Sequence, residues 1–199
     1  MPTETAPLGR RERNKQAKLE RIVAAAGALF AEHGVDEVTT QQIADAADIG
    51  TGTLFLYAKT KGELLLLVQN SLYAGAHERG LAAAANARTA LDGMMALLTP
   101  VIECNRAQVE NGRTYLREMA FGDPTEPHHA AALSIAGETE RALAETLTRL
   151  AEIPEAEASV LAHVATSILF VSMASRGAEA GVAEIVESVR TQIAAILPR

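Results

Sequence analysis

Six basic side chains lie close together in the sequence and have the chemistry to bind phosphate. They are Arg10, Arg11, Arg13, Lys15, Lys18 and Arg21. Only two acidic residues share this stretch, so the segment is positive although the whole chain carries a net charge of −7. A local positive patch on an acidic protein is what a small phosphate-contacting footprint needs. The alternative is a solvated, flexible tail. The two interpretations are compatible if the segment becomes ordered only when it binds DNA.

A second pattern, over residues 39–64, predicts two short helices joined by a tight turn. Thr39 and Gln42 have the spacing of a capping box, which opens the first of these helices. Gly50 either takes the turn or caps the second helix, which is expected over residues 51–57. Two short helices around a glycine-containing turn form a helix-turn-helix. Spacing alone leaves open that the pair is incidental, because any helical protein can contain one.

The elements that carry these residues are predicted to be helices throughout. Hydrophobic residues make up 48% of the chain and Trp is absent, and the abundant Ala and Leu favour helices over strands. Helical periodicity predicts about nine helices. The first runs from Glu12 to His33 and ends at Gly34, and the fourth opens with a capping box at Thr60. Later helices are expected over 89–104, 108–121, 127–151, 154–175 and 182–197, with Pro100 kinking or dividing the fifth.

Catalytic and metal-binding patterns are not recognisable in this chain. The single cysteine, Cys104, excludes an internal disulfide framework. The five histidines show no pair at metal-ligand spacing, and neither a nucleotide-binding glycine loop nor a serine nucleophile motif appears. We therefore expect no enzyme activity, no metal and no cofactor. The absence of a signal-peptide pattern and of a run of about 18 apolar residues predicts a cytoplasmic protein without a membrane partner.

The segment from about Ala17 to Val68 resembles the DNA-binding domain of the TetR family of bacterial transcriptional repressors. The resemblance is carried by Ile22, Ala25, Leu29, Phe30, Gly34, Val38, Thr39, Ile43, Ala44, Ala47, Ile49, Gly52, Thr53, Leu54, Phe55, Tyr57, Lys59, Lys61, Glu63 and Leu64. Gly50 replaces a usual serine and Ala58 a usual phenylalanine. Thr51 stands where the family often has a basic or polar residue, which leaves the operator sequence open.

The helix-turn-helix and the resemblance together predict an all-α chain with three parts. These are a disordered basic arm (1–12), a three-helix DNA-binding domain (13–60) and a helical effector-binding and dimerisation domain (61–199). Small or apolar residues of the second short helix are expected to face the major groove: Thr51, Gly52, Thr53 and Phe55. Phosphate contacts are assigned to Thr39, Lys61 and the arm around Arg13, and the resemblance implies one for Tyr57. Two further DNA contacts are expected at Thr40 and Gln41.

The resemblance implies a small-molecule effector enclosed by helices four to seven. The expected lining residues are Tyr73, Met94, Met95, Leu98, Tyr115, Glu118, Met119 and Phe121. Ordinary core packing is the alternative for each apolar member. Glu118 or its neighbour Arg117 is expected to orient the ligand.

The last two helices have more apolar surface than one small subunit easily buries. We therefore expect them to pair with a second copy in a four-helix interface. The residues expected there are Val164, Ile168, Val171, Ile185, Val189 and Ile193. The predicted function is that of a homodimeric repressor released from a palindromic operator by an effector. Two alternatives remain: a dimeric DNA-binding protein without an effector, and an all-helical binding protein or enzyme with an incidental helix-turn-helix.

Overall fold

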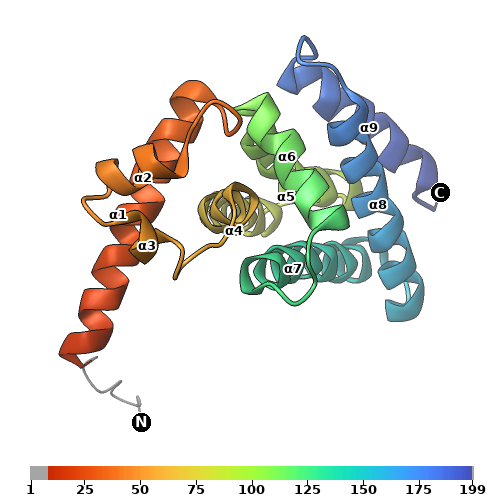
Figure 1. Ribbon diagram of the computed structural model, residues 1–199. Coiled ribbons are helices and arrows are strands. Elements are labelled where there is room, and N and C mark those ends of the chain that lie inside the picture. Colours follow the sequence, from red (N-terminus) through yellow and green to blue (C-terminus); the bar gives the residue numbers. More distant parts are fainter. Residues whose placement is uncertain (1–8, 199) are drawn as a thin grey trace. The chain divides into compact units, whose positions relative to one another are not determined.

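The protein is all-helical over residues 9–198, the part of the chain that the computed structural model describes (Figure 1). These residues form nine helices and no strand, which confirms the predicted fold class. The chain divides after Val68 into two compact units. Residues 1–8 of the expected disordered arm lie outside the described residues. Arg10 and Arg11 are helical, because the amide of Arg13 donates to the carbonyl of Gly9 and starts the first helix there.

The first unit contains three complete helices and the beginning of a fourth: α1 (Arg10–His33), α2 (Thr40–Ala46), α3 (Thr51–Leu54) and α4 (Lys61–Ala84). Its core is built on the predicted apolar stripe of α1. Ile22, Ala26 and Phe30 are fully buried, together with Leu54 of α3 and Leu64 of α4. Burial of this stripe holds the two short helices in place, because helices of four and seven residues are too short to be stable alone.

The local sequence signals of the first unit act largely as predicted. Gly34 ends α1 in a left-handed conformation with φ of 77°. Thr39 caps α2, and both hydrogen bonds of the capping box with Gln42 are present, at 3.2 and 2.8 Å. Gly50 takes the capping alternative at the start of α3, so the left-handed residue of the turn is Asp48, with φ of 52°. Aspartate tolerates this conformation better than most residues.

The second unit contains the rest of α4 and five further helices: α5 (Ala90–Arg106), α6 (Val109–Phe121), α7 (Pro127–Ala151), α8 (Glu155–Ser175) and α9 (Val182–Ile196). α5 packs against α6, α7, α8 and α9, and α8 lies against α7 and α9. Pro100 does not divide α5, which is one continuous helix. The bounds of α7 agree with the prediction, because Pro127 and a left-handed Glu152 mark its two ends.

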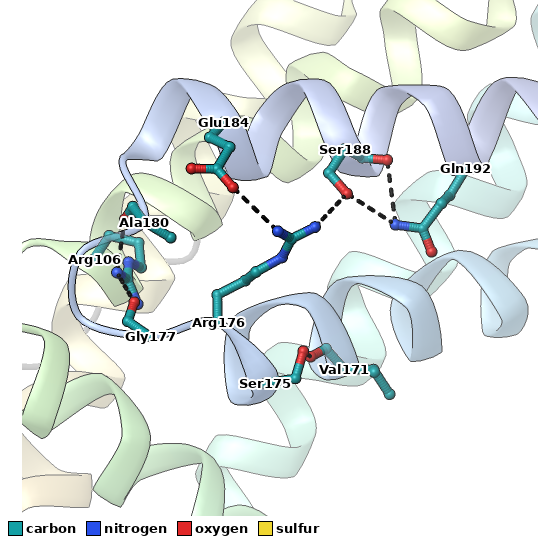
Figure 2. Close-up of polar contacts among 9 residues, drawn as sticks. All are labelled: Arg106, Val171, Ser175, Arg176, Gly177, Ala180, Glu184, Ser188 and Gln192. Carbon is teal, nitrogen blue, oxygen red and sulfur yellow. Dashed lines mark hydrogen bonds and ion pairs between the residues drawn. The ribbon is translucent and has the colours of Figure 1, made fainter.

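Two arginines fix the corner between α8 and α9 (Figure 2). Arg106, at the end of α5, is buried and donates from Nη2 to the carbonyls of Gly177 (2.8 Å) and Ala180 (2.7 Å). Arg176 lies at the surface and donates to Glu184 and to the Ser188 hydroxyl, both at 3.1 Å. The turn is thus held from inside by a buried guanidinium and from outside by an exposed one.

Among the described residues, one helix is long and apolar enough to cross a membrane by length and composition. It is α8, whose most apolar window has a mean hydropathy of 1.6 and is 33% buried. Ala162, Ala165, Leu169 and Met173 place one face of this helix in the core of the second unit. A core helix of a globular protein has this composition too, and the packing on α7 and α9 agrees with that interpretation.

Candidate nucleic-acid interface and apolar cavity

A basic groove runs along the surface of the first unit, between the N-terminal part of α1 and residues 50–57, which comprise α3 and its flanking residues and are called the α3 segment. Its lining comprises Arg10, Arg11, Glu12, Asn14, Lys15, Lys18, Thr53, Leu56 and Tyr57. Four cations and one carboxylate give the groove a positive potential, which attracts a polyanion. Thr53 and Tyr57 were predicted DNA contacts, whereas Arg13 does not line the groove. Sequence reasoning missed Leu56, although its position two residues after the buried Leu54 puts it on the opposite side of a helical turn.

The predicted groove-facing residues lie at the surface of the first unit. Gly52 and Phe55 are exposed, and Thr51 and Thr53 are half-buried. The Thr51 hydroxyl donates a 2.7 Å hydrogen bond to Oε1 of Gln41, whose Nε2 donates to Asp45 at 2.7 Å. This chain of bonds ties α3 to α2, so Gln41 is held by both ends of its amide.

Two residues predicted to bind phosphates also have partners within the first unit. The Tyr57 hydroxyl donates to the Lys15 carbonyl at 3.3 Å, and the Lys61 amine donates to the Asp36 carbonyl at 2.9 Å. An ammonium has three N–H donors, so this contact leaves Lys61 two more. Lys61 and Tyr57 therefore also brace α4 and the α3 segment against the rest of the unit.

The second unit contains an apolar cavity of about 90 Å³ that is partly open to solvent. Five helices contribute to its wall: Tyr73, Val101, Tyr115, Leu116, Met119, Ala132, Ile135, Ala136, Thr139, Thr166, Leu169, Phe170 and Met173. None of these side chains is an acid, a basic residue or a histidine, so a charged group placed inside would be desolvated without a counter-charge. Only an apolar, uncharged group fits this chemistry.

The structure brings together only part of the predicted ligand site. Tyr73, Tyr115 and Met119 line the cavity. Three other predicted residues, Met94, Met95 and Leu98, are fully buried in the core but away from the cavity wall. The remaining two do not reach it either: Phe121 is 86% exposed at the end of α6, and the carboxylate of Glu118 lies 3.9 Å from its helix neighbour Arg117.

Two stacked tyrosines connect the cavity wall to buried asparagines. The rings of Tyr73 and Tyr115 have centroids 4.4 Å apart. Tyr115 donates to Oδ1 of Asn70 at 2.9 Å, and Tyr73 accepts from Nδ2 of Asn105 at 3.0 Å. Burial raises the pKa of both phenols well above the ordinary value, so both are neutral donors or acceptors at physiological pH. Asn70 and Tyr73 belong to α4, the helix that continues into the first unit.

Comparison with known proteins identifies the family. Residues 22–68 match the model of the bacterial regulatory proteins of the tetR family, and these residues form the first unit from the middle of α1 onwards. These residues therefore form a DNA-binding domain of the TetR family, which comprises bacterial regulatory proteins. Its helix-turn-helix consists of α2 and α3. No curated protein matches the chain.

Solved structures of similar fold cover both units of this chain. FadR from Thermus thermophilus, a TetR family repressor in complex with lauroyl-CoA, is 24% identical with a TM-score of 0.69, over 91% of this chain and 96% of that one. FadR from Bacillus subtilis, in complex with stearoyl-CoA, is 16% identical with a TM-score of 0.68, over 90% and 99%. PfmR, also from Thermus thermophilus, is 18% identical with a TM-score of 0.61, over 90% and 100%. At these identities the likeness concerns the fold.

The residues predicted for the dimer interface separate into two groups. Val164 and Val171 are exposed on α8, Ile168 is half-buried, and Val160 extends the same exposed face. The three residues of α9 are instead fully buried within the subunit: Ile185, Val189 and Ile193. Their stripe packs against α5 and α8, so the apolar face of α9 is already covered and the prediction for that helix is corrected.

Proposed function

We propose that this protein is a homodimeric repressor that binds a palindromic operator and leaves it when a small apolar effector binds. The basic groove carries the proposal. Arg10, Arg11, Lys15 and Lys18 border the same depression as Thr53, Leu56 and Tyr57, and the last three lie within the segment that matches the family model. The α3 segment would then enter the major groove while the cations meet the flanking phosphates, with half-sites about 34–36 Å apart.

The predicted division of labour among the DNA contacts is kept as part of the proposal. Thr51, Gly52, Thr53 and Phe55 face the bases, whereas Thr39, Tyr57, Lys61 and the basic side chains of α1 hold phosphates. Thr40 and Gln41, at the start of α2, remain proposed DNA contacts, and the Thr51–Gln41 bond places Gln41 beside the α3 segment. Access to chromosomal DNA requires a cytoplasmic location, and no membrane partner is proposed.

The effector is proposed to place an uncharged, apolar portion in the cavity of the second unit. The acyl chains carried by the lauroyl-CoA and stearoyl-CoA complexes of two similar structures have this chemistry. The cavity, at about 90 Å³, is smaller than the usual ligand pocket of roughly 300–1,000 Å³. An acyl chain would therefore have to displace the lining side chains, and that displacement is how binding would reach Tyr115, Asn70 and hence α4.

Release of the operator on effector binding is a consequence of thermodynamic linkage. A ligand shifts the protein away from DNA only if it binds the DNA-incompetent state more tightly. Operator binding should therefore weaken in the presence of lauroyl-CoA and stay unchanged with free coenzyme A, which lacks the chain. Equal operator affinity under both conditions, together with no thermal shift from lauroyl-CoA, would support the alternative of a DNA-binding protein without this effector class.

A second copy of the chain is proposed to cover the exposed face of α8. Val160, Val164 and Val171 recur at helical spacing on that face, and an isologous contact would bury all three on both copies. Val164→Asp should convert a sedimenting dimer to a monomer at micromolar concentration. Phe121→Asp, which changes a more exposed apolar residue on α6, serves as the control and should leave the dimer intact. A wild-type monomer at this concentration would refute the interface.

The DNA-binding proposal is tested by selecting bound fragments from genomic DNA and titrating the tightest one with salt. Each phosphate contact contributes about 0.9 to the slope of log affinity against log salt. Lys18→Ala should therefore reduce the slope of a dimer by about 2, because one contact is lost from each subunit. Arg88→Ala, which removes an exposed cation of the second unit, should leave it unchanged. Binding without salt dependence would contradict the proposal.

A further inference from the structure

The α3 segment lacks the side chains that usually read base edges by hydrogen bonds. Residues 50–57 contain no arginine, lysine, amide or carboxylate, whereas guanine is typically read by Arg or Lys and adenine by Asn or Gln. The Thr51 hydroxyl and the Gln41 amide are bonded to each other, and the far end of that amide is bonded to Asp45. The Thr51 hydroxyl and the Gln41 amide are thus engaged within the protein. Among the residues expected to face the bases, Thr53 alone offers a further side-chain hydroxyl.

The same segment exposes apolar surface instead. Within the described residues of the first unit, Phe55 and Leu56 are the exposed large hydrophobic side chains, at 44% and 83%. Leu56 also lines the basic groove, so this apolar surface lies beside cations that would hold a phosphate backbone. A partner that is polyanionic outside and offers apolar groups inside fits both features.

Gly52 indicates a close approach by that partner. A Cβ built on Gly52 meets no atom of the protein within 4 Å, and its φ is not in the left-handed region. The fold itself therefore does not require glycine there. Glycine also weakens a helix, so its presence at this position does not serve the stability of the fold. Gly52 precedes Leu56 by four residues, which places the two on one face of a helical turn, away from the buried Leu54.

We propose that the protein reads its operator chiefly through thymine methyl groups, which Phe55 and Leu56 contact. The C5-methyl of thymine is the apolar group on a base edge in the major groove, and it distinguishes A·T from G·C and from the reversed pair. The absence of Cβ at Gly52 lets the base edges come close enough for these contacts. This inference rests on the proposed DNA-binding function and specifies the sequence chemistry that it uses.

The experiment compares thymine with uracil in the bound duplex. A randomised duplex library is selected on the wild-type protein, and the tightest duplex is resynthesised with deoxyuridine at every thymine. This change removes the methyl groups and keeps base pairing and every hydrogen-bonding group of the base edge. Loss of one buried methyl corresponds to about a fourfold loss of affinity. Two or more contacts should therefore weaken binding at least about tenfold, while the salt slope stays the same.

Variants locate the methyl contacts. Leu56→Ala changes a side chain that is almost fully exposed and should retain folding, weaken binding to the thymine duplex and shrink the thymine-to-uracil ratio. Phe55→Ala should act in the same direction. Gln41→Ala tests readout by the amide, and we expect it to leave the thymine-to-uracil ratio unchanged.

The outcomes separate the two proposals. Equal affinity of the wild-type protein for the thymine and uracil duplexes would overturn methyl readout and leave the DNA-binding function standing. An undiminished thymine-to-uracil ratio in both Leu56→Ala and Phe55→Ala would overturn the assignment to these residues. A library from which no salt-sensitive binder can be selected would instead contradict the proposed function itself.

Discussion

Tyr115 donates its hydroxyl proton to Asn70, and the 2.9 Å bond joins the wall of the apolar cavity to α4. Asn70 in turn donates to the carbonyl of His128 at the start of α7. Three helices therefore meet in one buried chain of hydrogen bonds beside the stacked tyrosines. A buried bond of this kind is costly to leave half-made, because the abandoned partner loses water without gaining a replacement.

Tyr115→Phe should accordingly destabilise the protein while keeping the stacked rings and the cavity wall. We expect a loss of about 1–3 kcal/mol in the free energy of unfolding, measured by urea denaturation, because Oδ1 of Asn70 loses its donor. Tyr57→Phe is the matched control, since its hydroxyl makes a longer, 3.3 Å bond at a half-buried site. Equal losses in the two variants would contradict the importance of burial.

Gly52→Ala should separate stability from DNA binding. Alanine is expected to stabilise the fold by about 0.5–1 kcal/mol or leave it unchanged, because the site is open and the helix gains a better former. Operator affinity should fall, since a methyl group now intervenes between α3 and the bases. Gly137→Ala, at another open glycine inside α7, provides the control with the same stability effect and no change in affinity. Undiminished binding by Gly52→Ala would argue against close approach at this residue.

Arg106→Ala should be far more damaging than Arg176→Ala. Removing the buried guanidinium takes its donor from the Ala180 carbonyl and leaves the Gly177 carbonyl only the 3.3 Å bond from the Ala180 amide. We expect this to cost about 3 kcal/mol. The exposed Arg176 makes surface contacts that are worth about 1 kcal/mol or less. Thermal and urea unfolding of both variants would measure the difference. Comparable stability of the two proteins would show that the inner contact does not hold the α8–α9 corner.

Cys104 should react slowly with alkylating reagents at neutral pH. Burial raises the pKa of its thiol from 9.0 to about 11, against a smaller opposing effect of the Arg79 charge. At pH 8 the reactive thiolate should be about 100-fold scarcer than for an ordinary cysteine. The folded chain holds a proton that the unfolded chain releases, so this thiol's contribution to stability is present below about pH 9 and falls away towards pH 11. Iodoacetamide rates against pH test this, and a folded-state midpoint below 9 would contradict it.

The N-terminal unit was predictable because its signals are local. The capping box of Thr39 and Gln42, the end of α1 at Gly34 and the stripe through Phe30 each depend on residues a few positions apart. The left-handed residue of the turn, Asp48, was harder to predict, because both aspartate and glycine tolerate tight turns and spacing does not choose between them. The first eight residues, where part of the arm was expected, are outside the described structure.

The cavity and the surface of the last two helices were harder to predict, since they depend on which elements become neighbours. Periodicity showed that α9 has one apolar face, but it could not show that α5 and α8 of the same subunit cover it. Met94 and Leu98 are apolar in the same way as Met119, yet only Met119 lines the cavity. The missed signal lies in α7, where Ala132, Ala136 and Thr139 recur at helical spacing and leave room opposite larger residues.

The small residues on that face of α7 make the size of the apolar cavity easy to change during evolution. Alanine codons are a single base away from valine and glycine codons, so changes at Ala132 or Ala136 can narrow or widen the space without altering the DNA-reading segment far away in sequence. Related regulators could thereby come to respond to different effectors while continuing to control the same promoters.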